Sequence, residues 1–80
     1  MTTAVMFIAC KAVENVERAI APALNEFKSR YSVKLDGEPI IEIKEDGSVI
    51  ILVVECQDKT EAQFLQKRFE SILKEHNLYG

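Results

Sequence analysis

The sequence predicts an α+β domain of two layers, in which one β-sheet packs against two helices. Residues 49–54 read Val-Ile-Ile-Leu-Val-Val after an Asp46-Gly47 turn, a pattern typical of a strand that is apolar on both faces. Apolar residues repeat every three or four positions over residues 13–31 and again over residues 62–76, which is the helical period. The expected order of elements is β-α-β-β-α.

The first element, Ala4–Ala9, is apolar throughout, which suits either a strand or the start of a helix. A strand is predicted because Met6, Phe7 and Cys10 would project toward the polar face of a helix. A helix is the alternative, since Val5 and Ala9 would continue the apolar stripe of the next helix. The order would then be α-β-β-β-α, which resembles a double-stranded-RNA-binding domain. Such domains begin their final helix with a lysine-rich stretch, whereas residues 58–61 here read Asp-Lys-Thr-Glu.

Residues 11–30 are predicted to form the first helix. Glu14 and Arg18 form one i,i+4 pair in the favourable order, and a second such pair follows at residues 26 and 30. Pro22 lies inside this stretch and cannot donate a hydrogen bond to the Arg18 carbonyl. We therefore expect a kink or a break near Ala21.

The segment from residue 33 to residue 57 is predicted to hold the remaining strands. Val33–Leu35 is a short strand, residues 36–39 carry turn chemistry, and Ile40–Ile43 has strand character. An antiparallel hairpin is expected over Ile40–Glu55, with Gly47 supplying the positive φ of its tight turn.

Asp58 is the expected N-cap of the second helix, and Glu61 completes a capping box. The buried face of this helix is predicted to carry Ala62, Leu65, Phe69, Ile72 and His76, and the helix should end near His76 or Asn77. The complete order resembles a ferredoxin-like split βαβ fold without its last strand. In this arrangement we expect the first and third strands to be parallel neighbours.

The 80 residues are expected to form one domain, residues 1–80, without a membrane span. The net charge of −3 argues against nucleic-acid binding, which needs a basic surplus or a basic face. The local basic cluster, Lys28, Arg30 and Lys34 around Tyr31, has acidic neighbours. Two cysteines are too few for a disulfide framework and no signal peptide is evident, so the expected location is cytoplasmic.

Cys10 and Cys56 are the candidate thiol pair. If they stand at the carboxyl ends of neighbouring parallel strands, just before helix N-termini, they could bind a soft metal or form a redox couple. The interpretation we favour is that both are small buried hydrophobic residues. Zinc usually takes four ligands, and the single histidine, His76, lies elsewhere in the chain. We therefore expect no catalytic residue, no metal and no cofactor.

Acidic residues gather around the hairpin, where Lys44 is the only basic residue. Such a patch could bind a basic protein or imitate nucleic-acid phosphates, or it could be a solvated rim that discourages aggregation. The candidate partner-binding residues here are Asp36, Glu38, Glu42, Glu45 and Asp46.

Phe64 is a further candidate for partner binding because it lies off the main apolar stripe of its helix. Together with Met6, Phe7 and Tyr79 it could form an exposed apolar patch, which would mark an association site. Alternatively, the apolar stripe of the helix is simply wide.

The strand with two apolar faces leads to the functional hypothesis, because two helices can barely cover both sides of a sheet. We expect a non-enzymatic protein–protein interaction module, a small regulator, inhibitor or subunit, that forms a homodimer. It would act through an apolar sheet or helix face and through the acidic hairpin. The alternatives are a small-molecule-sensing regulatory domain of ferredoxin-like type and a thiol or metal protein that uses Cys10 and Cys56.

Overall fold

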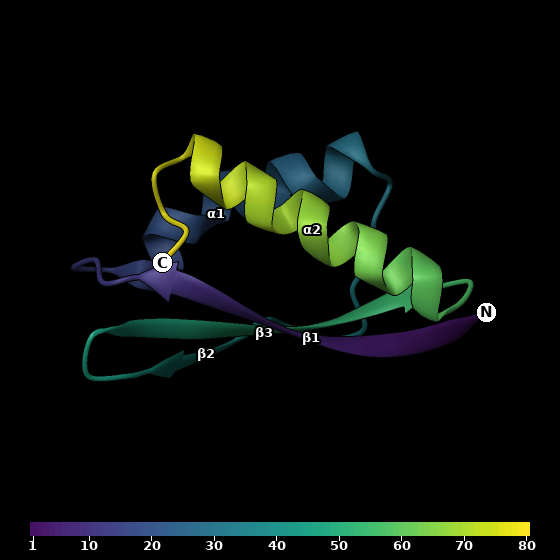
Figure 1. Ribbon diagram of the computed structural model, residues 1–80, viewed down its shortest axis with the longest axis horizontal. Helices are drawn as coiled ribbons and strands as arrows, with labels where there is room; N and C mark the ends of the chain where they lie inside the picture. The colour runs from purple at the N-terminus through teal and green to yellow at the C-terminus, as the bar shows by residue number, and fades with distance from the viewer.

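The computed structural model describes residues 1–80 as one sheet with both helices on the same side (Figure 1). In chain order the elements are β1 (Thr2–Lys11), α1 (Val16–Arg30), β2 (Ile40–Ile43), β3 (Gly47–Cys56) and α2 (Lys59–Glu75). The predicted α+β class and the β-α-β-β-α order are confirmed. Residues 4–9 lie within a strand, so the alternative order that begins with a helix is wrong.

The sheet has the strand order β1-β3-β2, and both neighbouring pairs are antiparallel. Met6 faces Leu52 across the first pair, and Ile41 faces Ile50 across the second. The expectation that the first and third strands are parallel is therefore wrong. After α1 carries the chain back along the sheet, β2 runs in the direction of β1, and the hairpin then reverses the chain into β3 between them. This is the split βαβ arrangement that the sequence suggested.

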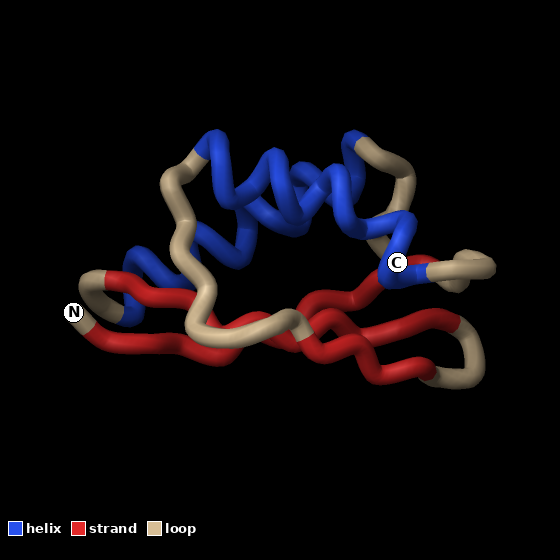
Figure 2. Tube along the Cα trace, turned by 180° about the vertical axis from the view of Figure 1, so that it is seen from behind, coloured by secondary structure: helices blue, strands red, loops and turns tan.

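The segment between α1 and β2 runs along the side of the molecule and joins the sheet before β2 begins (Figure 2). Leu35 forms a single bridge with Val54, and the Asp36 N–H donates to the Val53 carbonyl at 2.7 Å. Residues 36–39 then leave the ladder before Ile40 pairs with Ile51. The predicted short strand is thus one bridge, separated from β2 by the predicted turn.

The C-terminal tail lies beside the last residues of β1. The Lys11 N–H donates to the Leu78 carbonyl at 2.6 Å, and Tyr79 forms an isolated antiparallel bridge with Cys10. Leu78 is buried against the core. The tail therefore occupies only the end of the β1 edge, where a ferredoxin-like fold would place its last strand.

The hydrophobic core lies between the helices and the sheet. Alternate residues of β1 and β3 point into it, because successive side chains of a strand face opposite sides. From the helices, Phe27 and Phe69 are fully buried with ring centroids 4.9 Å apart. Truncating either ring to alanine typically costs about 3–5 kcal/mol, which is a large part of the stability of a domain of this size.

Helix α1 begins at Val16 and not at Lys11, because β1 extends through Lys11 and Asn15 is the N-cap. The Asn15 side chain accepts a hydrogen bond from the Arg18 N–H at 3.2 Å. The expected break near Ala21 is absent, since one helix continues through Pro22 to Arg30. Pro22 and Arg18 are both exposed, so water can satisfy the carbonyl that the proline leaves free.

Helix α2 confirms the predicted N-cap. Asp58 accepts the Glu61 N–H at 2.9 Å, and the Glu61 carboxylate accepts the Gln57 N–H at 2.7 Å, one residue before the usual position of a capping box. His76 is the C-cap, as the expected end of the helix requires, but it is exposed and does not share the buried face. Its Nε2 lies 3.1 Å from Glu26 Oε1.

The glycine with a positive φ is Gly37, at +94°, and not Gly47 as the sequence suggested. Gly47 is the first residue of β3. A Cβ at this position would lie 2.7 Å from the Cys10 carbonyl oxygen. Glycine is needed there because the backbones of two strands approach closely, and not because of the turn conformation.

Candidate functional site

The sheet has one face that no other part of the chain covers. Both helices lie on the opposite side, and the view from behind shows the same single-sided arrangement (Figures 1 and 2). The side chains of this uncovered face come from the alternate positions that point away from the helices. Its apolar members are Val5, Phe7 and Ala9 from β1, Val49, Ile51 and Val53 from β3, and Ile40 from β2.

A row of three apolar side chains crosses the middle of this face. Phe7 lies opposite Ile51, and Ile51 lies opposite Ile40, so each strand contributes one member. Phe7 is 62% exposed and Ile40 is 58% exposed, whereas Ile51 between them is half-buried by its neighbours. Val5, at 56% exposed, extends the row toward the N-terminal half of β1. Single exposed apolar residues are common on soluble proteins, but a contiguous group across three strands is typical of a surface that binds another molecule.

Charged and polar residues lie at the margin of the uncovered face. Thr3 and Glu55 are cross-strand partners near one end, and Glu42 lies opposite Val49 near the other. Glu42 forms an exposed ion pair with Lys44. An apolar centre with a polar margin is the usual anatomy of a protein–protein interface.

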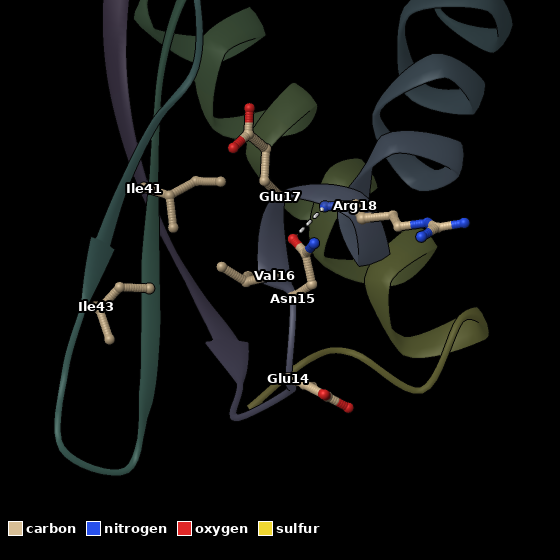
Figure 3. A pocket seen from close by; sticks show the side chains of 7 residues that line it. All are labelled: Glu14, Asn15, Val16, Glu17, Arg18, Ile41 and Ile43. Atoms are coloured by element: carbon tan, nitrogen blue, oxygen red, sulfur yellow. Dashed lines mark hydrogen bonds between the residues drawn. The ribbon is translucent and has the colours of Figure 1, made fainter.

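A second surface feature is a groove between α1 and β2 (Figure 3). Ile41 and Ile43 point from β2 toward the helix, Val16 points back toward the strand, and Arg18 points away from the groove. The hollow here has a volume of about 770 Å³. A second hollow of about 470 Å³ adjoins it, because Glu17 and Ile41 line both. The groove therefore has apolar walls with carboxylates beside them.

The five acidic candidate residues are all exposed, but they are distributed over different parts of the surface. Glu38 lines the groove beside α1, whereas Glu42 lies on the uncovered face of the sheet. Asp46 lines a small hollow that also contains Lys11 and Lys44. Asp36 and Glu45 belong to the segments that flank β2. The structure thus places the acids around the β2 edge and the hairpin.

Cys10 and Cys56 do not lie near each other, which removes the geometric basis for a thiol pair. Because β1 and β3 are antiparallel, Cys56 lies opposite Thr2, at the other end of β1 from Cys10. Eight residues of strand correspond to about 27 Å. Both thiols are buried and free, and burial raises the pKa of Cys10, which disfavours the reactive thiolate. No three His, Cys, Asp or Glu side chains come together in an arrangement that could hold a metal ion.

Phe64 does not join the apolar patch that the sequence suggested. Met6 is buried beneath the helices, and Phe7 lies on the far side of the sheet. Phe64 instead packs on the helical layer, where its ring meets Tyr31 edge-on at 6.2 Å and lies beneath the Arg68 guanidinium at 4.8 Å. Phe64 is 46% exposed, which makes it a partly covered side chain of the helix surface.

Sequence reasoning identified the strand with two apolar faces but not the residues that remain uncovered. Ile40, Ile51 and Phe7 form one row only because the strand order places β3 in the middle of the sheet. The available signal was the alternation within residues 49–54, which divides the run into two sets of three. The sequence alone does not show which set the helices cover.

No helix of the structure has the length and apolar character that crossing a membrane requires. Comparison of the chain with protein-family models, with curated proteins and with solved structures finds no match.

Proposed function

We propose that this chain is a non-enzymatic protein-interaction module that forms a homodimer by stacking the uncovered sheet faces of two copies. The observation that carries the proposal is the row of Phe7, Ile51 and Ile40 on a face without helices. Sheets pack face to face about 10 Å apart with interdigitating apolar side chains, and a second copy offers a face of the same chemistry. The homodimer is therefore the simplest assembly that shelters this surface.

The expected energy of stacking is sufficient for a dimer. Covering on the order of 600 Å² of apolar sheet per copy contributes about 15 kcal/mol before the costs of association are subtracted. Those costs consume much of this gain, so we expect a reversible dimer. The margin of carboxylates and lysines would stay in water.

Sedimentation equilibrium of the purified chain and of Ile51→Lys tests this proposal. Lysine in the middle of the face would have to be buried without a partner, so the stacked dimer should be lost. The matched control is Phe64→Gln, which removes an exposed aromatic side chain from the helical layer and should leave the mass unchanged. A wild-type chain that is monomeric at high micromolar concentration would contradict the proposal, and so would an Ile51→Lys chain with wild-type association.

The acidic residues around the hairpin support a second part of the proposal, namely that the dimer binds a basic protein. Glu38, Glu45 and Asp46 are exposed, and the first of them stands beside the apolar groove under α1. Exposed charges at a rim raise the association rate and favour a partner of opposite charge.

A lysine-rich peptide labelled with a fluorophore is a suitable probe of this surface. Its binding should weaken steeply as salt rises, and Glu38→Gln with Asp46→Asn should reduce it. Glu75→Gln on α2 is the matched control, because Glu75 belongs to the helical layer, where it pairs with Arg30. Binding that does not respond to salt, or that responds equally to the control substitution, would refute this part.

A further inference from the structure

We propose that the outer edge of β1 is a second self-association site, at which β1 of one copy pairs antiparallel with β1 of another copy. This pairing would join two three-stranded sheets into one of six strands. It uses backbone groups at the sheet edge, whereas the stacked dimer uses side chains of the sheet face. The two contacts are therefore independent and can fail separately.

The hydrogen-bonding direction of β1 follows from one contact at its C-terminal end and one contact on the neighbouring strand β3. The Lys11 N–H donates outward to the Leu78 carbonyl, away from β3. On β3, the Val53 carbonyl accepts from Asp36 on the β2 side, so the odd-numbered residues of β3 point away from β1. Because backbone groups alternate in direction along an antiparallel strand, the N–H and C=O groups of the odd-numbered β1 residues face the open edge. These are Thr3, Val5, Phe7 and Ala9.

The two edges of this sheet are protected to very different degrees. Proteins usually guard an open edge with charges, proline, a bulge or a short strand. The β2 edge has four residues, follows Pro39 and carries Glu42, and α1 stands beside it across the groove. By contrast, β1 has ten residues, and residues 2–10 contain no charge and no proline. An edge of this length and composition is a template for another strand.

A second copy of β1 fits the open edge because the unpaired stretch of β1 can pair antiparallel with the same stretch of another copy. The tail pairs with Cys10 and Lys11, which leaves the stretch from Thr3 to Ile8 free. In an antiparallel pair centred on Met6, Val5 would face Phe7 of the other copy. Both are uncharged, and each has its outward backbone groups matched, as an isologous two-fold interface requires.

The helical layer above this edge also suits a two-fold neighbour. The side of α2 that faces away from α1 carries a polar hollow lined by Gln63, Gln66, Lys67 and Glu70. In the paired arrangement α2 of one copy would run antiparallel to α2 of the other. Lys67 of one copy and Glu70 of the other would then lie along the same seam, where opposite charges attract and amides can exchange hydrogen bonds.

Amide hydrogen exchange of the unmodified protein tests the pairing directly. In a single chain the amides of Val5 and Phe7 have no acceptor, whereas those of Met6 and Ile8 point toward β3. Edge pairing predicts slow exchange at all four positions, with protection of the odd residues increasing with protein concentration. Stacking of the sheet faces leaves the odd amides open to water. Fast exchange at the odd positions at every concentration would overturn the proposal.

Variants separate the edge contact from the face contact by mass. The Ile51→Lys chain, in which face stacking is blocked, should still sediment as a dimer of twice 9.1 kDa. Adding Val5→Pro should convert it to the monomer, because proline removes one outward donor and its ring obstructs the incoming strand. The matched control is Ile41→Pro on β2, because the backbone N–H of Ile41 points away from β3 at the opposite edge of the sheet. It should leave the dimer intact.

Each pattern of masses decides both proposals. A wild-type species larger than a dimer together with a dimeric Ile51→Lys chain supports both contacts. A wild-type dimer that Ile51→Lys converts to monomer supports stacking and overturns the edge. A dimer that survives Ile51→Lys and is lost with Val5→Pro supports the edge and overturns stacking. A wild-type monomer overturns both. Circular dichroism checks that Val5→Pro is folded, and the amide exchange requires no variant.

Discussion

Phe7→Thr is the substitution whose effect on the stacked dimer can be worked out most directly. A phenylalanine side chain buries roughly 200 Å² when fully covered. Phe7 is 62% exposed, so about 120 Å² remains to be covered by a partner, which corresponds to about 3 kcal/mol at about 25 cal/mol per Å². Threonine retains part of this area and keeps the preference for a strand. We expect a loss of about 2 kcal/mol per copy, or about 4 kcal/mol for two copies, which weakens dimerisation roughly a thousandfold.

Sedimentation equilibrium from nanomolar to high micromolar concentration measures this change. The folding control is urea denaturation, since the single chain should lose only about 1 kcal/mol from the cross-strand contact between Phe7 and Ile51. Phe64→Gln, which also removes a partly exposed aromatic ring, should leave the association constant unchanged. A Phe7→Thr chain that is folded and associates as tightly as the wild type would refute the placement of the interface on this face.

Three predictions concern the folded chain. Gly47→Ala should lower the free energy of unfolding by about 1–3 kcal/mol in urea, because its Cβ would lie 2.7 Å from the Cys10 carbonyl oxygen; wild-type stability would contradict this contact. Asp58→Ala should cost about 1 kcal/mol through loss of the α2 cap, and Asp58→Ser should restore most of it; equal stabilities would show that the cap contributes nothing. Burial raises the pKa of the Cys10 thiol above 9.0, so the unfolded chain ionises first as pH rises. The free energy of unfolding should therefore keep its full value below pH 9.0 and fall at higher pH, by at most about 1.4 kcal/mol per pH unit. A Cys10→Ala chain with the same decline would refute this origin.

Much of the fold could be predicted because local chemistry and packing agree. The capping residues Asp58 and Glu61, the hairpin and the amphipathic face of α2 each have a signature within a few residues. The predicted bounds of an element are less accurate where a capping residue starts the helix later than the apolar periodicity suggests. Helix α1 starts at Val16 because Asn15 caps it, although the apolar periodicity extends further toward the N-terminus.

The parts that the sequence did not predict are relations between elements distant in the chain. Gly47 has no positive φ; its importance comes from Cys10, which lies on another strand. The antiparallel arrangement of β1 and β3 separates the two thiols that a parallel arrangement would have brought together. His76 has the correct helical spacing for the buried face but lies at the C-cap, where the side chain turns toward Glu26.

For the candidate site, the sequence predicted a surplus of apolar sheet but not its location. Phe64 is off the buried stripe as expected, yet the body of the molecule separates it from Phe7. The five acids are adjacent in sequence, but alternation along β2 sends Glu42 to one face while Glu38 lines the groove on the other side. In both cases the direction of a side chain depends on which face the helices cover.

The core between helices and sheet is complete within one chain, so folding does not depend on association with a second copy. Phe27, Phe69 and the inward side chains of β1 and β3 need no second molecule to be buried. A single chain can therefore reach its folded state alone. In the proposed dimer, association would follow folding, and the concentration of the chain would set the fraction of molecules that are paired without altering how any one of them folds.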